Sequence, residues 1–138
     1  MRQLATVVSV ETQRGLTEVT STVQRVVRSS GIRDGLCTLF LQHTSASLVI
    51  QENADPSVRR DLEAFLSRLV PDGDALFTHT TEGDDDMSAH VKAALTKTSE
   101  QIPVVRGELA LGTWQGLYIW EHRRRGQRRQ LAIHVLGD

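Results

Sequence analysis

The fold is decided by the stretch Gly35-Leu36-Cys37-Thr38-Leu39-Phe40-Leu41-Gln42-His43. Successive side chains of a β-strand point to opposite faces, so this stretch predicts a strand. One face would carry Cys37, Leu39, Leu41 and His43. Phe40 on the other face suggests that the strand is buried on both sides. The strand therefore ends with an imidazole at the border of the core, just before the turn Thr44-Ser45-Ala46.

Further strands are predicted around this one from alternating apolar residues and turn signals. They cover residues 4–11, 47–53, 102–105, 109–111, 117–122 and 129–136. Helices are predicted in three places: from a cap at Thr20 to a stop at Gly31, from Asp55-Pro56 to Pro71, and from about Asp86 onward. Because strands dominate, the fold class is α+β: a β-rich mixed sheet or sandwich with two or three covering helices.

The two later helices are each predicted to bury an apolar stripe. The stripe of the helix that begins at Pro56 comprises Val58, Leu62, Phe65, Leu66 and Leu69. In the last helix the stripe comprises Met87, Val91, Ala94 and Leu95. At 100° per residue His90 falls on the flank of this second stripe, so its ring is expected to point toward the body of the protein.

Composition restricts the class of protein. The 138 residues fit a single domain, residues 1–138, with 16 Lys and Arg against 17 Asp and Glu. A nucleic-acid-binding protein would normally carry a basic excess. No apolar run approaches the roughly 20 residues of a membrane span, and Met1-Arg2-Gln3 leads straight into a strand instead of a signal peptide. The lone Cys37 is expected to be a small buried hydrophobe, and the protein is expected to be cytoplasmic.

Three histidines lie in polar surroundings that predict a site. They are His43, His79 and His90, and imidazoles both bind divalent metals and transfer protons near neutral pH. If they converge on a cation, the nearby acids Glu82, Asp84, Asp85 and Asp86 would orient the rings. The alternative is that these acids only favour the positive N-terminus of the following helix. The spacing of the histidines matches no established zinc signature.

A second candidate is Leu111-Gly112-Thr113-Trp114-Gln115-Gly116. Its glycines would let backbone N–H groups approach a ligand, and Trp114 could stack on a heteroaromatic ring. The competing interpretation is a hairpin turn in which Trp114 plugs the core. The strand that follows carries Glu121 at the end of an apolar row. A buried carboxylate there would be costly unless paired, which makes Glu121 a candidate acid/base or ligand.

The arginine run Arg123-Arg124-Arg125-Gly126-Gln127-Arg128-Arg129 allows three interpretations. Arginine binds phosphate bidentately, so a phosphorylated substrate is one. A solvated hairpin tip is the commoner meaning of such a run and is favoured for most of the five. RNA binding is disfavoured by the balanced charge and the scarcity of aromatic residues. Thr44, Ser45 and Ser47 are expected to donate hydrogen bonds to anionic oxygens; no nucleophile elbow is present.

Taken together, these motifs resemble one family. They are Gln42-His43-Thr44-Ser45-Ala46-Ser47, Glu52-Asn53-Ala54-Asp55-Pro56, His79 with Glu82-Gly83-Asp84-Asp85-Asp86-Met87, Ala89-His90-Val91-Lys92, Leu111-Gly112-Thr113-Trp114-Gln115-Gly116 and Trp120-Glu121-His122-Arg123. Their order along nearly the whole chain resembles the YjbQ family, long catalogued as uncharacterised and often labelled secondary thiamine-phosphate synthase. Gln51 stands where the family pattern has Asn, and Ser88 where Pro is usual after Met.

The resemblance implies a compact α+β domain assembled as a homotrimer, with sites near subunit boundaries. It also implies a weak ability to join a pyrimidine diphosphate to a thiazole phosphate with release of pyrophosphate. The leaving pyrophosphate would be stabilised by a cation such as Mg²⁺ or by arginines. A cluster of histidines instead favours Zn²⁺, so the divalent metal, Zn or Mg, stays open.

The predicted site follows from the residues and the resemblance together. His43, His90 and Glu121 are expected to be catalytic, Thr44, Ser45, Trp114 and Gln115 to bind substrate, and His43, His79 and His90 to bind the metal. The expected partners are a phosphorylated small molecule and further copies of the chain, with neither nucleic acid nor membrane. The alternative function is a trimeric protein that binds a metal or a phosphorylated metabolite without turnover of its own.

Overall fold

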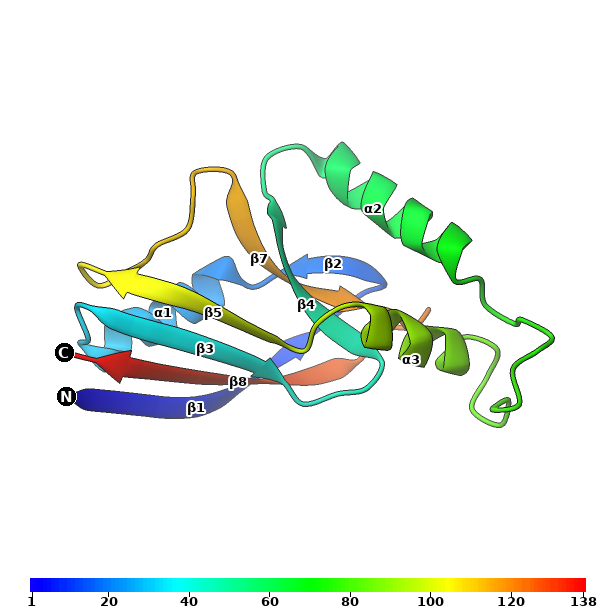
Figure 1. Cartoon of the computed structure of the whole chain (residues 1–138), viewed down its shortest axis with the longest axis horizontal. Helices are drawn as coiled ribbons and strands as arrows, with labels where there is room; N and C mark the ends of the chain where they lie inside the picture. The colour runs from blue at the N-terminus through cyan, green and yellow to red at the C-terminus, as the bar shows by residue number, and fades with distance from the viewer.

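In a computed structural model that describes residues 1–138, the chain forms two antiparallel sheets and three helices (Figure 1). The larger sheet has the order β1-β8-β3-β5-β6 and the smaller sheet the order β2-β7-β4. The strands are β1 Arg2–Glu11, β2 Gly15–Glu18, β3 Gly35–Leu41, β4 Ala46–Glu52, β5 Ser99–Val105, β6 Glu108–Leu109, β7 Gln115–Glu121 and β8 Arg128–Gly137. The predicted α+β class is confirmed, and all strand pairings are antiparallel.

The helices are α1 Thr20–Ser30, α2 Pro56–Leu69 and α3 Asp86–Leu95. Gly31 ends α1 at φ 69°, in the left-handed region that glycine adopts without strain. The predicted cap at Thr20 is wrong, because Val19 occupies the N-cap position and no side chain caps this helix. The hydroxyl of Thr20 instead accepts the Leu117 N–H. At α2 the prediction is confirmed, since Asp55 accepts the N–H of Ser57 beside Pro56.

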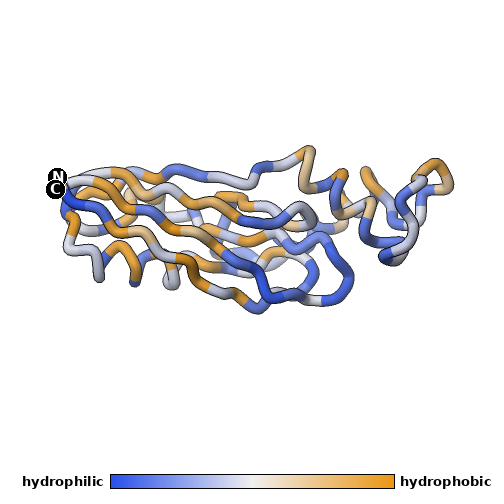
Figure 2. The backbone as a smooth tube through the Cα atoms, turned by 90° about the horizontal axis from the view of Figure 1, so that it is seen from below, coloured by the Kyte–Doolittle hydropathy of each residue, from blue (hydrophilic) through white to orange (hydrophobic).

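One apolar core lies between the sheets and α1. It contains Val23 and Val27 of α1, Leu39 of β3 and Ile119 of β7, all fully buried. Hydrophobic and hydrophilic residues alternate along the strands, as a sheet with one covered face requires (Figure 2). Cys37 belongs to this core, and burial raises the pKa of its thiol to about 11. The prediction of a small buried hydrophobe at Cys37 is therefore confirmed.

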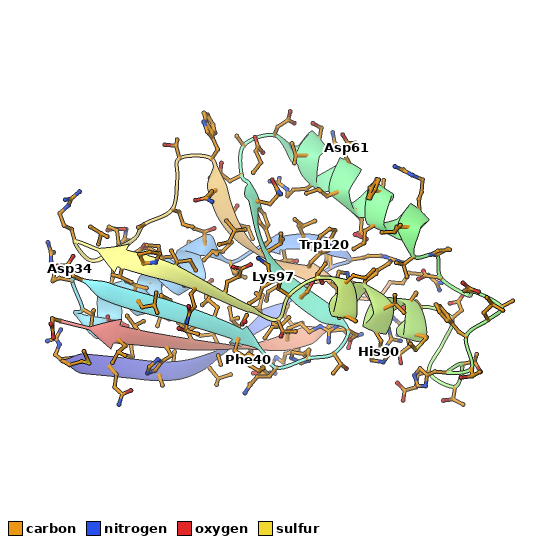
Figure 3. All side chains as sticks on the ribbon, viewed as in Figure 1. Asp34, Phe40, Asp61, His90, Lys97 and Trp120 are labelled. Carbon is orange, nitrogen blue, oxygen red and sulfur yellow. The ribbon has the colours of Figure 1, made fainter.

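The outer face of the larger sheet is uncovered in the single chain. Phe40 is 50% exposed and Val7 is 52% exposed, and the Phe40 side chain projects from the end of β3 (Figure 3). The expectation that Phe40 makes β3 a strand buried on both faces is therefore wrong for one chain. These side chains border an apolar hollow of about 280 Å³, which Thr38, Ala132 and His134 also line.

The stripes predicted for α2 and α3 are largely wrong. In α2 only Leu66 is buried, while Phe65 and Leu69 are exposed. The buried residues of α3 are Asp86, Ser88, Ala89 and Lys92, whereas Leu95 is exposed. The face of α3 that meets the protein is thus mostly polar. Hydrophobic periodicity cannot identify such a face, because its polar side chains are satisfied by partners distant in the sequence.

The two ends of the molecule differ in character. The termini lie side by side at one end of the larger sheet, where the Met1 ammonium is 3.1 Å from Asp138 (Figure 1). At the opposite end, α3 and the connection between α2 and α3 extend beyond the strands (Figure 1). None of the helices is long and apolar enough to cross a bilayer. The polar end is where the candidate site lies.

Candidate functional site

Two histidines converge on one carboxylate at the start of α3. Asp86 Oδ2 lies 2.7 Å from His79 Nε2 and 3.0 Å from His90 Nε2. One helical turn separates Asp86 from His90, so both project from the same side of α3. His79 arrives from the preceding connection. The ligand atoms of this cluster, which we call the His–Asp–His triad (His79, Asp86 and His90), all lie within 4.8 Å of one another.

A backbone carbonyl fixes the hydrogen pattern of His90. The carbonyl oxygen of Thr44 lies 2.8 Å from His90 Nδ1 and can only accept, so Nδ1 carries the hydrogen. A neutral His90 ring then presents the lone pair of Nε2 to the carboxylate of Asp86. Only a protonated ring, or a cation placed between the two groups, makes this contact favourable. Metal-bound histidines commonly donate their other N–H to a backbone carbonyl in this way.

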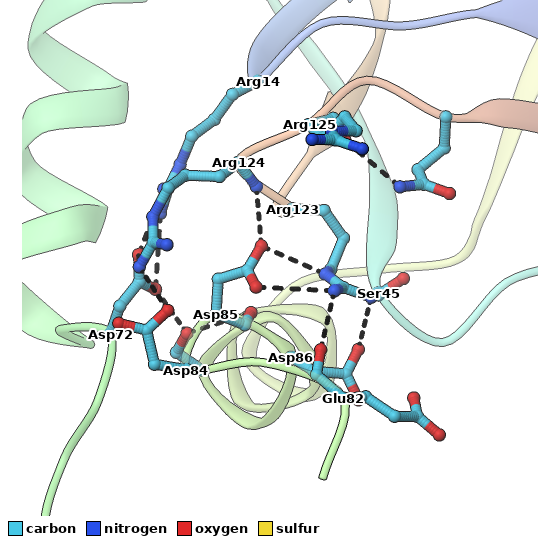
Figure 4. A network of polar contacts seen from close by, with 12 residues as sticks. Arg14, Ser45, Asp72, Glu82, Asp84, Asp85, Asp86, Arg123, Arg124 and Arg125 are labelled. Atoms are coloured by element: carbon cyan, nitrogen blue, oxygen red, sulfur yellow. Dashed lines mark hydrogen bonds and ion pairs between the residues drawn. The ribbon is translucent and has the colours of Figure 1, made fainter. Parts of the chain in front are cut away.

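Arg123 holds the acidic side of the triad (Figure 4). Its Nη1 donates to Asp86 Oδ1 at 2.7 Å, its Nε to Asp85 Oδ2 at 3.1 Å, and its Nη2 to the Glu82 carbonyl at 3.1 Å. Burial would raise the pKa of Asp85, but the hydrogen bonds from the Arg123 side chain and the Arg124 N–H, together with the charge of Arg123, outweigh it and lower this pKa to about 2. Arg123 thereby leaves Oδ2 of Asp86 turned toward both histidines.

The triad is open on its histidine side. The side chain of Asp86 is only 3% exposed, whereas those of His79 and His90 are 39% and 31% exposed. Burial would raise the pKa of Asp86, but the hydrogen bond from His79 and the charges of His90 and Arg123 hold it below its usual value. His79 also lines a pocket of about 270 Å³ with Phe77, Thr80, Asp74 and Asp84. A ligand at the triad would therefore have room beside His79.

His43 is not part of the triad. Its Nε2 accepts the backbone N–H of Gln130 at 2.7 Å, and Arg129 lies 3.3 Å from its Nδ1. Burial, together with the positive charge of Arg129, lowers the pKa of this histidine. The structure thus brings together two of the three predicted histidines, with Asp86 as the third group. The main-chain carbonyl beside His43, that of Thr44, does reach His90.

Glu121 is fully buried and fully paired. Arg129 donates to it through Nε at 2.7 Å and through Nη2, Thr12 donates its hydroxyl, and the Arg123 N–H donates to Oε2 at 3.1 Å. The predicted need for a partner is confirmed. The Ser45 side chain also already has a partner, because its hydroxyl accepts a hydrogen bond from Arg129 at 2.9 Å. These contacts make Glu121 and Ser45 structural supports of the site in the single chain.

Trp114 and Gln115 lie at the other end of the smaller sheet. In the β4–β7 pair, Gln115 faces Glu52 and Glu121 faces Ala46. Six residues of extended strand separate these two ends by about 20 Å. Trp114 is 65% exposed, so the interpretation as a core plug is wrong. Gln115 Oε1 accepts the Gly112 N–H and closes its own loop. Within one chain, Trp114 and Gln115 therefore do not share a pocket with the triad.

Most of the arginine run is engaged with acids. Arg124 bridges Asp72 at 3.2 Å and Asp84 at 2.6 Å, while Arg123 and Arg129 make the contacts described above. Arg124, Arg125 and Arg128 are nevertheless exposed, so the interpretation as a solvated hairpin tip is confirmed for three of the five arginines. It is wrong for Arg123 and Arg129, which are half-buried and buried. Only Arg123 and Arg129 have buried acidic partners: Asp85 and Asp86 for the first, Glu121 for the second.

Sequence reasoning missed the direct role of Asp86 and the clamp by Arg123. The first had a signal, because Asp86 and His90 are spaced i, i+4 at the start of a predicted helix. Asp86 had been expected only to orient a ring. The clamp by Arg123 had no signal in the sequence, since Arg123 is 37 residues from Asp86 along the chain. Only the tertiary fold brings the end of β7 against the start of α3.

The fold and the site define a small α+β protein with a His–Asp–His cluster at the polar end of an antiparallel sandwich. A family profile described as UPF0047 protein YjbQ-like matches residues 5–138. A UPF0047 protein of Synechocystis is 52% identical over 138 residues, covering 99% of this chain and 94% of that protein. UPF0047 protein YjbQ of Escherichia coli O157:H7 is 46% identical over 104 residues, 75% of each chain.

A solved structure from Clostridium acetobutylicum, described as an uncharacterized conserved protein of the YjbQ/UPF0047 family, is also similar. It superposes with a TM-score of 0.86 at 34% identity, covering 95% of this chain and 99% of that one. The chain therefore belongs to the YjbQ-like UPF0047 family, as the sequence motifs predicted.

Removal of Arg129 should destabilise the protein, because Glu121 then stays buried without a counter-charge. We expect Arg129→Met to lower the free energy of unfolding by about 3–5 kcal/mol, because an uncompensated carboxylate is left in the interior. The double variant Glu121→Leu with Arg129→Met should recover much of this loss. Urea unfolding of the variants measures it. Arg128→Met is the control, since Arg128 pairs with Glu11 at the surface; equal losses for Arg128→Met and Arg129→Met would refute the interpretation.

Proposed function

We propose that the protein binds a divalent transition-metal ion at the His–Asp–His triad and that the ion holds a phosphorylated small molecule. The observation that carries this proposal is the pairing of His90 with Thr44 and Asp86. The Thr44 carbonyl takes the Nδ1 hydrogen, so whenever His90 is neutral the lone pair of its Nε2 faces the carboxylate that His79 also faces. A cation between these atoms would convert an unfavourable contact into coordination.

The donor set favours zinc over magnesium. Two imidazole nitrogens and one carboxylate oxygen suit Zn²⁺, whereas Mg²⁺ prefers oxygen ligands and keeps several waters. Ligands about 2.0 Å from Zn²⁺ in a tetrahedron stand about 3.3 Å apart. The separations of 2.7 and 3.0 Å from Asp86 Oδ2 to the two rings require only a small widening. The exposed sides of both rings leave room for a further ligand.

Local charge explains why a phosphate would depend on the ion. The pocket beside His79 is lined by Asp74 and Asp84 and by no lysine or arginine. Arg123 and Arg124 are already engaged with acids. An anionic substrate would therefore be repelled by the site without a metal. A bound ion would supply positive charge to the phosphate and polarise its oxygens.

The reaction suggested by the family resemblance is the joining of a pyrimidine diphosphate to a thiazole phosphate with release of pyrophosphate. The second candidate is binding of a metal or phosphorylated metabolite without turnover. The position of Trp114 and Gln115, about 20 Å from Glu121 along β7, favours the second candidate for an isolated chain. The full pairing of Glu121 favours it too, because no acid/base group is free there.

Elemental analysis of the purified, tag-free protein tests the metal. We expect one zinc per chain in the native protein and little or none in His79→Ala, His90→Ala and Asp86→Asn. His43→Ala should keep the metal, because its ring bonds to Gln130 and not to the triad. Asp84→Asn is the matched control for the acid. Absence of metal from the native protein after incubation with Zn²⁺, or equal loss in His43→Ala, would contradict the triad as the site.

Turnover is tested separately with the two phosphorylated substrates. If the protein is a transferase, formation of thiamine phosphate should fall by about 10²-fold or more in His90→Ala. The measurement is chromatographic detection of the product against a reaction without protein. A native protein that binds zinc but forms no product above that background would leave the binding function and exclude this reaction.

Self-association, which the resemblance implies, is proposed to use the outer face of the larger sheet. Phe40 and Val7 expose apolar surface there around a hollow. We expect the native protein to sediment as a trimer and Phe40→Arg to dissociate toward monomers, because a charge would be buried in the interface. Phe65→Arg, on the exposed side of α2, should remain trimeric. A native monomer, or a trimer unaffected by Phe40→Arg, would refute this assignment.

A further inference from the structure

Two buried side chains behind α3 each have a polar atom without a partner. Lys92 of α3 and His122, just after β7, are both 0% exposed. The ammonium nitrogen Nζ of Lys92 and the ring nitrogen Nδ1 of His122 make no hydrogen bond. Leaving such groups unpaired in the interior is costly, and native proteins usually satisfy them with protein or ordered water. These two atoms therefore point to a small polar occupant.

The charge of Lys92 acts on His122. Burial lowers the pKa of His122 to about 3, and among the neighbouring charges Lys92 has the largest effect, ahead of Arg129 and Arg14. The other ring nitrogen of His122, Nε2, lies 2.9 Å from the buried hydroxyl of Ser47. The Trp120 ring lies beside the imidazole, with centroids 5.6 Å apart. His122 is thus enclosed by Ser47, Trp120 and the helix that carries Lys92.

The charges around Lys92 favour a neutral occupant. Among the neighbouring charges Arg14 acts on Lys92 most strongly, and Asp72, Glu63 and Asp85 act in the opposite direction. These carboxylates already accept from other donors: Asp72 from Ser88 and Arg14, Glu63 from Trp120, and Asp85 from Arg123. Lys92 thus lies among charged groups of both signs without being hydrogen-bonded. An additional anion would meet the three carboxylates, and an additional cation would meet Lys92 and Arg14.

We propose that Lys92 Nζ and His122 Nδ1 border an internal site that binds ordered water between α3 and the smaller sheet. The water accepts from the Lys92 ammonium and donates to Nδ1 of His122. His122 then carries its hydrogen on Nε2 and donates it to the hydroxyl of Ser47. A buried water needs two to four polar partners, and this arrangement supplies them.

The internal water makes Lys92 a positioning residue for α3; this step rests on the proposed function. Asp86 and His90 belong to the same helix, whose buried residues are mostly polar. Few apolar contacts fix the helix against the smaller sheet, so its register depends on polar contacts such as those of Ser88 and Lys92. A shift of α3 would move Asp86 and His90 relative to His79, which comes from the connection before the helix.

Nitrogen-15 NMR of the native full-length protein tests the water site without any variant. Protonated and bare imidazole nitrogens differ widely in chemical shift, so long-range correlations identify the hydrogen-bearing nitrogen of His122. We expect a bare Nδ1, a protonated Nε2 and cross-relaxation from a long-lived water to the ring protons. A protonated Nδ1, or no long-lived water near the ring, would overturn the proposal.

The positioning role is tested by zinc titration of Lys92→Met beside Lys97→Met. Lys97 is the other lysine of the chain, and its side chain is largely exposed. We expect Lys92→Met to weaken zinc binding about 10-fold or more, as losses of outer supporting groups do, and Lys97→Met to leave it unchanged. Equal affinities would overturn the positioning role. A native protein that binds no zinc would instead refute the proposed function, and the NMR result would still decide the water site.

Discussion

The buried ion pair between Glu121 and Arg129 is the contact on which the polar end of the molecule depends. It joins the last residue of β7, in the smaller sheet, to the second residue of β8, in the larger one. Arg129 also binds the carbonyl and hydroxyl of Ser45, which fixes the turn that presents the Thr44 carbonyl. Glu121 in turn accepts the N–H of Arg123, whose side chain clamps Asp85 and Asp86. One charge pair thus positions groups on both sides of the triad.

Neighbouring side chains at the end of β7 point to opposite faces of the smaller sheet, because side chains alternate along a strand. Glu121 turns toward Arg129, whereas Trp120 and His122 lie on the side of α2 and α3, where Trp120 donates to Glu63. In that outer layer the contacts are mostly polar. Elements with few buried apolar side chains open more readily than a packed core. The candidate ligands Asp86 and His90 therefore sit on the part of the molecule least fixed by hydrophobic packing, which explains why arginine clamps are needed there.

Local signals were enough to predict every strand except β2, the caps at Asp55 and Gly31, and the burial of Cys37. They failed wherever partners far apart in sequence decide the outcome. The inward face of α3 is polar because Ser88 meets Asp72 and Asp86 meets Arg123, which no periodicity encodes. The ring of His43 is turned away from the triad by Gln130, 87 residues distant. The core-plug alternative for Trp114 failed because the exposure of this side chain depends on its place at the end of β7, which the sequence does not show. By contrast, the i, i+4 spacing of Asp86 and His90 is visible in the sequence and indicates that the two side chains are neighbours on one helix.

The separation of Trp114 from the triad limits what one chain can do. Strand β7 places Trp114 and Gln115 about 20 Å from Glu121, at the end of the strand that adjoins the triad, and a ligand that uses both Trp114 and the triad would have to cover that span. A single-ring phosphate or diphosphate is shorter than that. Within one subunit, the triad and the Gly112–Gly116 loop must therefore bind different molecules or serve different purposes. They could share a ligand only if assembly brings the loop of one chain to the triad of another. The oligomeric state therefore decides which chemistry is possible. A reaction that uses both the triad and the Gly112–Gly116 loop requires an assembly, whereas the proposed metal binding at the triad requires only the single chain.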